Sequence, residues 1–234
     1  MTGWRKRARR CRRRIWEFFG SDRYSRPALH DIDRKLERFL NFDNGFFIEA
    51  GANDGFEQSN TYYFEALRGW SGLLIEPIPA LACECRRNRR VPVVEAALTD
   101  RDGDGSVLKL HYAGLMTVAE GALGDAWAEA SHVASGLKVQ AIDSTYTIEA
   151  PARTLSSLIE EYAVGRTVDL LSLDIEGGEA KALRGLDFDR HAPRFICVEV
   201  RRQAEIETIL RPFYRQVAIL SETSTYRDIL YERV

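Results

Sequence analysis

The chain has 234 residues, of which 45% are hydrophobic and 29% are charged, and its formal net charge is −2. This length and apolar content predict one globular domain with a full core and exclude a largely disordered chain. No apolar run approaches the roughly 20 residues of a membrane-spanning helix, which excludes an integral membrane protein. The basic N-terminus also lacks the apolar stretch of a secretory signal peptide.

The four cysteines do not have the spacing of a structural metal site. Cys83 and Cys85 are separated by a single residue, and no histidine pair lies beside them, whereas zinc sites place two to four residues between their cysteines. Cys11 and Cys197 stand alone in the sequence. We therefore expect reduced thiols and a cytoplasmic protein.

The first 20 residues carry a concentrated positive charge. They hold eight lysines and arginines against one glutamate, a local charge of +7, so the total of −2 leaves −9 for the remaining residues. The acidic remainder argues against a nucleic-acid-binding surface. The basic run continues into Ile15, Trp16, Phe18 and Phe19, a combination typical of peripheral membrane contacts. The segment therefore has two interpretations, a contact with the inner membrane face or another polyanion, and a solvated tail.

Apolar spacing after residue 30 predicts alternating helices and strands, beginning with a lead-in helix over residues 31–40. Strands are expected at 46–50, 73–75, 93–97, 168–173 and 195–200, and helices at 61–67, 80–90, 154–162, 180–186 and 204–213. Residues 217–220 and 229–231 are expected to form a closing hairpin. Alternation of this kind predicts an α/β fold with a mainly parallel sheet and helices on both faces.

Residues 100–150 interrupt this alternation. The segment opens with turn-forming residues, and β segments are expected at 107–112 and 137–142, with weak periodicity between them. An insert of this length is expected to act as a lid or specificity region beside a site, or else to extend one edge of the sheet.

The first expected strand continues into a loop of small residues, Glu49-Ala50-Gly51-Ala52-Asn53-Asp54-Gly55. Parallel sheets bind ligands at the carboxyl ends of their strands, and small residues let the backbone approach a ligand closely. A dinucleotide-binding loop would carry the pattern Gly-x-Gly-x-x-Gly. Counted from Gly51, the other two glycine positions hold Asn53 and Phe56. This loop therefore disfavours a nicotinamide-dependent oxidoreductase.

Glu76 ends the second expected strand, 25 residues after Gly51. A carboxylate at that position can accept hydrogen bonds from both hydroxyls of a ribose. The glycine loop and Glu76 together predict a ligand that contains adenosine.

Three carboxylates follow the fourth expected strand, within Asp174-Ile175-Glu176-Gly177-Gly178-Glu179. Crowded carboxylates raise one another's pKa, which would make a better general base for an alcohol. Asp174 and Glu176 are therefore the catalytic candidates, while Glu179 is expected to be structural.

Two other assignments remain open for this edge of the sheet. Asp174, Glu176 and Glu199 could instead hold Mg²⁺, which would orient and acidify a hydroxyl. His111 in the insert is a further candidate base, with His132 as its rival.

Two segments together resemble a known family. Residues 46–80 (FFIEAGANDGFEQSNTYYFEALRGWSGLLIEPIPA) and the run VDLLSLDIEGGEAKALRGL resemble the FkbM-type methyltransferases, a branch of the class I S-adenosylmethionine-dependent enzymes. The more specific parts are Ser59-Asn60-Thr61 and the run GLLIEP that ends in Glu76-Pro77. The resemblance implies a Rossmann-like fold with seven strands, the last of them antiparallel. It places the methyltransferase domain at residues 41–234 and leaves the basic tail and lead-in helix, residues 1–40, outside it.

The resemblance also implies roles for individual residues. Glu49, Gly51 and Asn53 would face the methionine part of S-adenosylmethionine. Glu76 would hold the ribose, and Glu95 with Ala96 would flank the adenine. The cofactor-binding set is therefore Glu49, Gly51, Asn53, Gly55, Glu76, Glu95 and Ala96.

The predicted function is O-methylation of a small-molecule or glycan acceptor, on a hydroxyl of a sugar or natural-product scaffold. An enzyme that methylates amines of nucleic acids would carry an Asn/Asp-Pro-Pro-aromatic run where this chain has Asp174-Ile175-Glu176-Gly177. The alternatives are a non-catalytic module that keeps the cofactor fold and a nicotinamide-dependent oxidoreductase. The sequence leaves the oligomeric state open.

Overall fold

Strand β1 lies near the middle of a seven-stranded sheet with the order β10-β11-β9-β8-β1-β2-β3. The computed structural model describes residues 3–234. The strands of this sheet are β1 (Phe46–Ala50), β2 (Ser71–Ile75), β3 (Val93–Val94), β8 (Leu170–Leu173), β9 (Phe195–Val200), β10 (Tyr214–Glu222) and β11 (Arg227–Arg233). Neighbours from β3 to β9 pair in parallel, whereas β11 is antiparallel to both β9 and β10. The sheet has the seven strands and the antiparallel last strand that the family resemblance implies.

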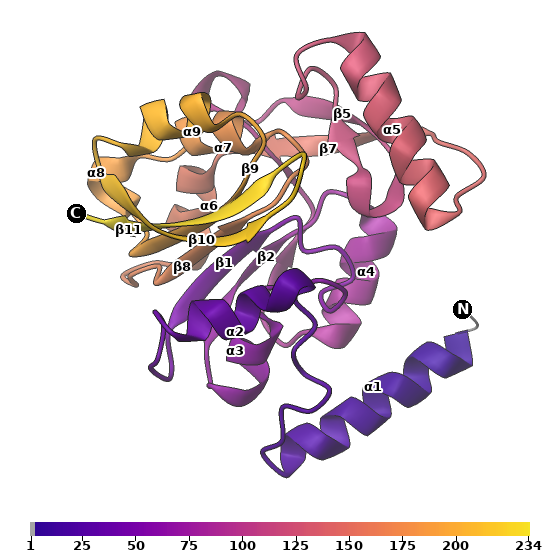
Figure 1. Ribbon diagram of the computed structural model, residues 1–234, viewed down its shortest axis with the longest axis vertical. Coiled ribbons are helices and arrows are strands. Elements are labelled where there is room, and N and C mark those ends of the chain that lie inside the picture. Colours follow the sequence, from indigo (N-terminus) through magenta and orange to yellow (C-terminus); the bar gives the residue numbers. More distant parts are fainter. Residues whose placement is uncertain (1–2) are drawn as a thin grey trace.

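Alternate residues of the strands face two separate cores. Phe46, Ile48 and Ala50 belong to one hydrophobic cluster, whereas Phe47 belongs to the other. The first core is covered by α6 (Leu155–Tyr162), α7 (Glu179–Arg184), α8 (Phe188–His191) and α9 (Gln203–Leu210). The second is covered by α2 (Ile32–Glu37), α3 (Tyr62–Leu67) and α4 (Pro79–Asn88). Figure 1 shows these groups on opposite faces of the sheet, as predicted.

The expected strand at 93–97 is divided between two sheets. Val93 and Val94 pair with the end of β2 in the main sheet, whereas β4 (Ala97–Leu98) pairs with Ala152 and Arg153 of β7 (Thr147–Arg153). The chain leaves the main sheet between these two short strands.

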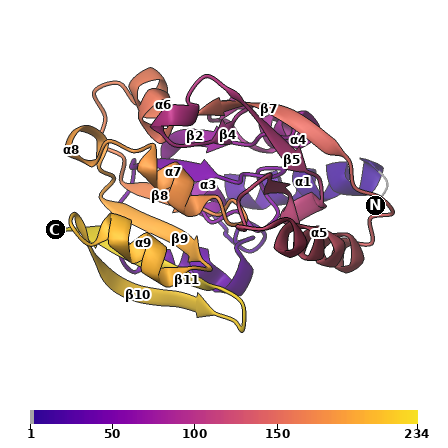
Figure 2. The ribbon, with the colours of Figure 1, turned by 90° about the horizontal axis from the view of Figure 1, so that it is seen from above.

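The insert forms a second sheet, with the order β4-β7-β5-β6, together with a long helix. Its further elements are η2 (Arg101–Gly103), β5 (Val107–His111), η3 (Gly114–Met116), β6 (Val118–Ala119) and α5 (Ala126–Gln140). The β segment expected at 137–142 is wrong, because most of it is the last turn of α5. Asp125 caps the start of this helix by accepting a hydrogen bond from the amide of Ala128. Figure 2 shows α5 beside β5 at one end of the main sheet.

The basic N-terminal segment is a helix, α1 (Gly3–Phe18), most of whose residues are exposed. The Arg13 guanidinium lies 3.6 Å from the ring centroid of Phe56, and the hydroxyl of Tyr62 donates to Glu17 at 2.8 Å. In Figure 1, α1 lies along the margin of the molecule, and the chain continues through η1 (Leu29–Asp31) into α2. Residues 1 and 2 of the expected tail lie outside the described residues. Among residues 3–234, no helix is long and apolar enough to cross a membrane.

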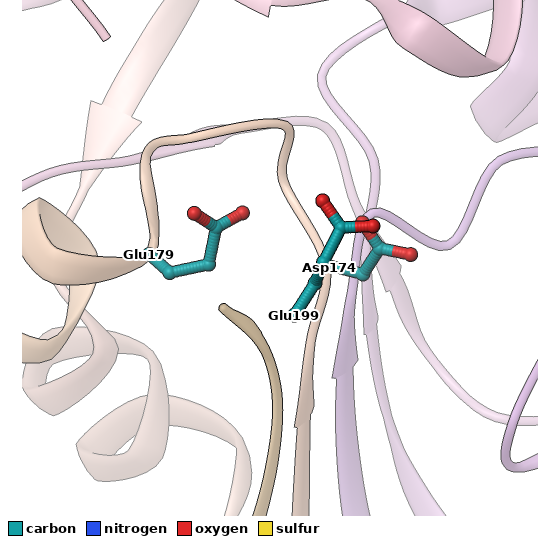
Figure 3. A group of neighbouring side chains, drawn as sticks. All are labelled: Asp174, Glu179 and Glu199. Carbon is teal, nitrogen blue, oxygen red and sulfur yellow. The ribbon is translucent and has the colours of Figure 1, made fainter. Parts of the chain in front are cut away.

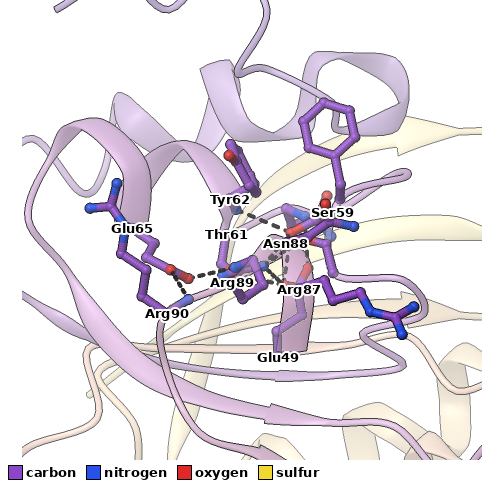
Figure 4. A network of polar contacts seen from close by, with 12 residues as sticks. Glu49, Ser59, Thr61, Tyr62, Glu65, Arg87, Asn88, Arg89 and Arg90 are labelled. Atoms are coloured by element: carbon purple, nitrogen blue, oxygen red, sulfur yellow. Dashed lines mark hydrogen bonds and ion pairs between the residues drawn. The ribbon is translucent and has the colours of Figure 1, made fainter. Parts of the chain in front are cut away.

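A buried arginine joins β1 to the helices on one face of the sheet (Figure 4). Arg89 follows α4, and its side chain is completely buried. Its Nη1 atom lies 3.2 Å from Glu49 Oε2 and donates to Ser59 Oγ at 3.0 Å, while Nη2 donates to Thr61 Oγ1 at 2.8 Å. Its Nε atom donates to Glu65 of α3. One guanidinium therefore holds together β1, α3, α4 and the loop between β1 and α3.

Glu49 fixes the same loop from the side of the strand. Its Oε2 accepts from the hydroxyls of Ser59 and Thr61 at 2.8 and 2.6 Å, and its Oε1 accepts from the amide of Asn60 at 2.8 Å. The loop that follows β1 is consequently held by a buried acid, rather than by apolar packing alone.

We expect Arg89→Met to lower the free energy of unfolding by about 3–5 kcal/mol, the range for removing one partner of a buried ion pair. The substitution leaves the carboxylates of Glu49 and Glu65 buried without their counter-charge. Chemical denaturation followed by circular dichroism would measure the loss. The matched control is Arg86→Met, which removes an exposed ion pair of α4 with Glu95 and should cost at most about 1 kcal/mol. Equal losses for the two variants would contradict the role assigned to Arg89.

Candidate active site

A cavity opens at the carboxyl ends of β1, β2 and β8, where a parallel sheet binds its ligands. Together with the solvent at its open mouth, the space enclosed by its walls is about 1040 Å³. The lining residues include Glu49, Gly51, Asn53, Gln58, Ser59, Asn60, Glu76, Ala96, Leu98, Leu110, Leu115, Thr117, Ser172, Asp174 and Glu176. The insert therefore supplies part of the cavity wall.

Gly51 is required by the backbone geometry at the end of β1. Its φ is +80°, and a Cβ atom at this position would lie 1.8 Å from the backbone oxygen of Asp174. Its amide and that of Ala52 both donate to the carbonyl of Ile75 at 3.1 Å. The loops after β1 and β8 are therefore in direct backbone contact, which only glycine permits.

Three larger residues of the cavity wall also have left-handed backbone conformations. The φ angles of Asn53, Gln58 and Glu176 are 50°, 61° and 56°. Such conformations cost free energy and are found preferentially at functional sites. Among residues 3–234, three of the seven non-glycine residues with a positive φ therefore lie in the wall of this one cavity.

Glu76 is buried at the end of β2, and each of its carboxylate oxygens accepts one backbone hydrogen bond. The amide of Asn53 donates to Oε2 at 2.7 Å, and the amide of Ile78 donates to Oε1 at 3.0 Å. Burial raises the pKa of Glu76 to about 7, although these two hydrogen bonds act in the opposite direction. Each oxygen retains lone pairs that can accept from a ligand.

The structure brings together most of the expected cofactor-binding set, but not all of it. Gly55 is not part of the cavity wall, because it lies against the side chains of Cys85 and Arg89. Glu95 also lies apart, since it forms a surface ion pair with Arg86. The members that line the cavity are Glu49, Gly51, Asn53, Glu76 and Ala96.

Beside the cavity lies a cluster of acids, shown in Figure 3. Carboxylate oxygens of Asp174, Glu179 and Glu199 lie within 4.8 Å of one another. Asp174 directly follows β8 and faces the cavity, and Glu199 lies on β9. Oε1 of Glu179 accepts from the amides of Ile175 and Gly177 at 2.9 and 3.0 Å. Glu179 thus holds the loop after β8, the structural role that the sequence predicts for it.

Glu176 belongs to a neighbouring group of charged residues. Its Oε2 lies 2.6 Å from Nη2 of Arg201 and 3.3 Å from Nε2 of His132 on α5. The same Nη2 atom lies 2.8 Å from Glu199 Oε1. Glu176 therefore lies outside the set of acids that could share a cation, in which Glu179 takes its place. His111 ends β5, where it pairs with Val118 and Thr147, and is not part of the cavity wall.

The acids of the cluster bind protons more tightly than isolated carboxyl groups. The side chain of Asp174 is exposed at the cavity. Restricted contact with water, together with the negative charges of Glu199 and Glu176, raises its pKa well above the ordinary value. Burial and the charge of Glu176 likewise raise the pKa of Glu199. A carboxylate with a raised pKa is a stronger base once it is ionised.

The donors around this cluster fit shared protons better than a divalent cation. Arg201 already provides positive charge to Glu199, and two peptide N–H groups occupy one oxygen of Glu179. Because positive charge and backbone donors already meet part of the negative charge of these acids, we derive no step through a metal.

A comparison with family models identifies the chain. The model described as the methyltransferase FkbM domain matches residues 49–230, more than three quarters of the sequence. The chain belongs to the FkbM methyltransferase family. It is therefore an S-adenosylmethionine-dependent methyltransferase, as the sequence predicts, and the oxidoreductase alternative has no support.

Solved structures share features of the fold with this FkbM methyltransferase at low sequence identity. A SAM-dependent methyltransferase from Aquifex aeolicus is 12% identical, with a TM-score of 0.46, over 89% of this chain and 92% of that one. The human methyltransferase 10 domain containing protein is 11% identical, with a TM-score of 0.42, over 86% and 80%. For a mutant of MtNAS the values are 10% and 0.41, and the match covers 86% of this chain but only 58% of that one. No curated protein sequence matches the chain significantly.

Some residues that shape the site of the FkbM methyltransferase were not predicted from its sequence. Ser172 accepts a hydrogen bond from the side chain of Asn60 at 3.1 Å and lines the cavity. Arg89 neutralises Glu49 near the end of β1. The available signal was that an acid at the end of an apolar strand requires a buried partner. The sequence does not indicate which of many arginines is that partner.

We expect Gly51→Ala to weaken S-adenosylhomocysteine binding at least tenfold and to destabilise the fold by about 2–5 kcal/mol, combining a left-handed backbone with overpacking. Gly105→Ala is the matched control, because Gly105 has a similar φ of +78° with nothing within 4 Å of an added Cβ atom. The control should lose only about 1–2 kcal/mol and retain binding. Calorimetric titration and thermal unfolding would measure both effects. A control that loses as much as Gly51→Ala would contradict the steric argument.

We also expect S-adenosylhomocysteine to bind about tenfold more weakly at pH 6 than at pH 8, because protonation of Glu76, with its pKa of about 7, removes an acceptor for ribose hydroxyls. Calorimetry over this range would test the effect. Glu76→Gln should bind weakly with no such pH dependence. Glu95→Gln, outside the cavity, should behave like the unmodified enzyme. A flat pH profile for the unmodified enzyme would contradict the ribose assignment.

Proposed function

We propose that the enzyme methylates a hydroxyl group of a sugar, a glycan or a natural-product scaffold. The observation that carries the proposal is the position of Asp174, whose carboxyl group faces the cavity with a raised pKa, in a loop that touches Gly51. This position supports a role for Asp174 as the base, beside the loop that is expected to hold the methionine part of the cofactor.

Methyl transfer to a hydroxyl requires two contributions from the protein, a base and the positioning of the two reactants. Bound S-adenosylmethionine would supply an electrophilic methyl group on a sulfonium that departs as a neutral thioether when the acceptor oxygen takes the methyl carbon. The Asp174 carboxylate would accept the hydroxyl proton. An alcohol is a weak nucleophile at neutral pH, so removal of its proton as the bond forms lowers the barrier. Positioning of the two reactants contributes most of the remaining rate acceleration.

The cofactor is proposed to lie along the carboxyl ends of β1 and β2. Glu76 would accept from the ribose hydroxyls, Ala96 would lie beside the adenine, and Gly51 and Asn53 would approach the methionine part. Glu49 would contribute mainly by holding the loop, because both of its oxygens already accept hydrogen bonds from residues 59–61.

The insert is proposed to select the acceptor. Leu110, Leu115 and Thr117 form a mostly apolar part of the cavity wall. Such a wall fits the carbon faces of a sugar or a scaffold ring. The net charge of −9 outside the first 20 residues supports a small-molecule or glycan acceptor rather than a nucleic acid.

We expect Asp174→Asn to reduce turnover by about 10²–10⁴-fold, the usual contribution of a general base, while the Kd for S-adenosylhomocysteine changes by less than about threefold. The assay would follow S-adenosylhomocysteine release with a panel of sugars, oligosaccharides and hydroxylated ring compounds. Asp169→Asn is the matched control, because Asp169 lies at the opposite end of β8 and bonds to the amide of Phe46. It should retain turnover.

The same assay separates the proposal from its rivals. Because the cluster fits protons rather than a cation, turnover should be equal in EDTA and in Mg²⁺. Loss of turnover in EDTA that Mg²⁺ restores would reassign Asp174 to a metal site. Cofactor binding without transfer to any acceptor would instead support the non-catalytic module.

A further inference from the structure

Helix α1 contacts the rest of the molecule through one face only. Arg13 is buried, with its guanidinium over the rings of Phe56 and Tyr62 at 3.6 and 4.6 Å. Glu17, one turn further on, accepts from Tyr62 and from the hydroxyl of Ser25 at 2.7 Å. This face is built mainly from charge, cation–π contacts and hydrogen bonds, and Trp16 adds an edge-to-face contact with Tyr24.

The apolar residues of α1 lie on the opposite face. Trp4 precedes Arg13 by nine residues, which is two and a half turns of an α-helix, so their side chains point in opposite directions. The spacing of four and three residues continues the face of Trp4 along the helix. We call this face the apolar stripe, and it consists of Trp4, Ala8, Cys11, Ile15 and Phe18. Trp4 is 77% exposed and Phe18 85% exposed, and Phe19 extends the stripe beyond the helix at 76%.

Basic residues border the apolar stripe on both sides. Arg7 and Arg14 lie along one border, and Arg5 and Arg12 lie along the other, each pair separated by seven residues, about two turns. All four are exposed, and two of them also contact the protein: Arg12 lies over the ring of Tyr24 at 4.2 Å, and Arg14 donates to the carbonyl of Arg87 at 3.1 Å. The exposed part of α1 is therefore an apolar stripe between two rows of positive charge.

We propose that α1 lies in the plane of an anionic lipid bilayer, with the apolar stripe inserted among the lipids and the bordering arginines on the phosphates. Helices that bind at membrane interfaces have this distribution of aromatic and basic residues. Each basic side chain at an anionic surface contributes about 1 kcal/mol, and the exposed aromatic residues add their burial. Charge complementarity favours lipid phosphates, because the remainder of the chain, at −9, would be repelled by the same surface if α1 did not carry +7.

The face of α1 that carries Arg13 connects the proposed lipid-binding helix to the wall of the cavity. Arg13 donates to Asn88, whose side-chain amide donates to the carbonyl of Asp54 at 2.8 Å, in the loop that also contributes Asn53 and Gln58 to the cavity wall. The helix and this loop are thus joined by direct contacts. Membrane binding would place this side of the cavity within roughly the width of one helix, about 10 Å, of the lipid surface.

The test measures partition of the full chain onto vesicles by co-sedimentation at about 0.1 M salt, where charge still acts over about 10 Å. Vesicles of phosphatidylcholine with about 30% phosphatidylserine would be compared with phosphatidylcholine alone, and we expect at least tenfold stronger partition onto the anionic vesicles. The triple variant Trp4→Ser, Ile15→Ser, Phe18→Ser should lose at least tenfold. Trp127→Ser is the matched control, because Trp127 on α5 is 80% exposed, and it should partition like the unmodified protein.

The charges are tested separately. Arg5→Gln with Arg12→Gln should weaken partition by about fivefold per residue, whereas Arg211→Gln, an exposed arginine beyond α9, should change it less than twofold. Circular dichroism and S-adenosylhomocysteine binding confirm that each variant is folded. Because no methyl acceptor is used, failure of the O-methylation proposal does not affect this result.

Three outcomes would overturn the proposal. The first is equal partition onto both kinds of vesicle, and the second is a triple variant that partitions normally. The third is binding of duplex DNA or heparin that depends on Arg5 and Arg12 without any partition onto vesicles, which would make the helix a contact for soluble polyanions.

Discussion

The buried contact between Arg89 and Glu49 is the interaction on which the cavity depends. A carboxylate at the end of a central strand is costly to bury, and its partner must bring enough hydrogen bonds to offset the loss of water. Arg89 does so by bonding at once to β1, to α3 and to the loop between them. The ion pair therefore specifies the path of residues 55–61, in which Gln58 keeps a left-handed conformation at the cavity wall.

Unlike Glu49, which Arg89 neutralises, Asp174 and Glu199 at the ends of β8 and β9 are costly to ionise. Burial and mutual repulsion raise the pKa values of Asp174 and Glu199, so the folded state holds their protons more tightly than the unfolded chain does. Their ionisation therefore lowers stability as the pH rises from the ordinary carboxyl pKa toward the raised values. Arg201 limits this cost by pairing with Glu199 and Glu176. A site that is destabilised when it is ionised, but rigidly held, is suited to accept a proton.

Much of the fold follows from apolar spacing, because buried strands and amphipathic helices each have a characteristic period. The rule that ligands bind at the carboxyl ends of parallel strands was enough to select Gly51, Glu76 and Asp174 as neighbours. The sequence could not predict that Glu179, rather than Glu176, lies beside Asp174 and Glu199. This arrangement depends on the left-handed turn at Glu176 and Gly177. The second sheet depends on pairing between residues about 50 apart, for which the local sequence carries no signal.

The N-terminal helix shows how charge and apolar spacing can remain ambiguous until one contact is known. The sequence supports both a solvated tail and a membrane contact, because a run of eight basic residues is compatible with either interpretation. The burial of Arg13 decides which face of α1 is occupied, and the apolar residues must then face away from the protein. A helix that packs through its charges and exposes its aromatic residues is the inverse of an ordinary surface helix. That inversion is physically reasonable only if the exposed face meets another apolar phase, and the contacts of Arg13 place this phase beside the loop that lines the cavity.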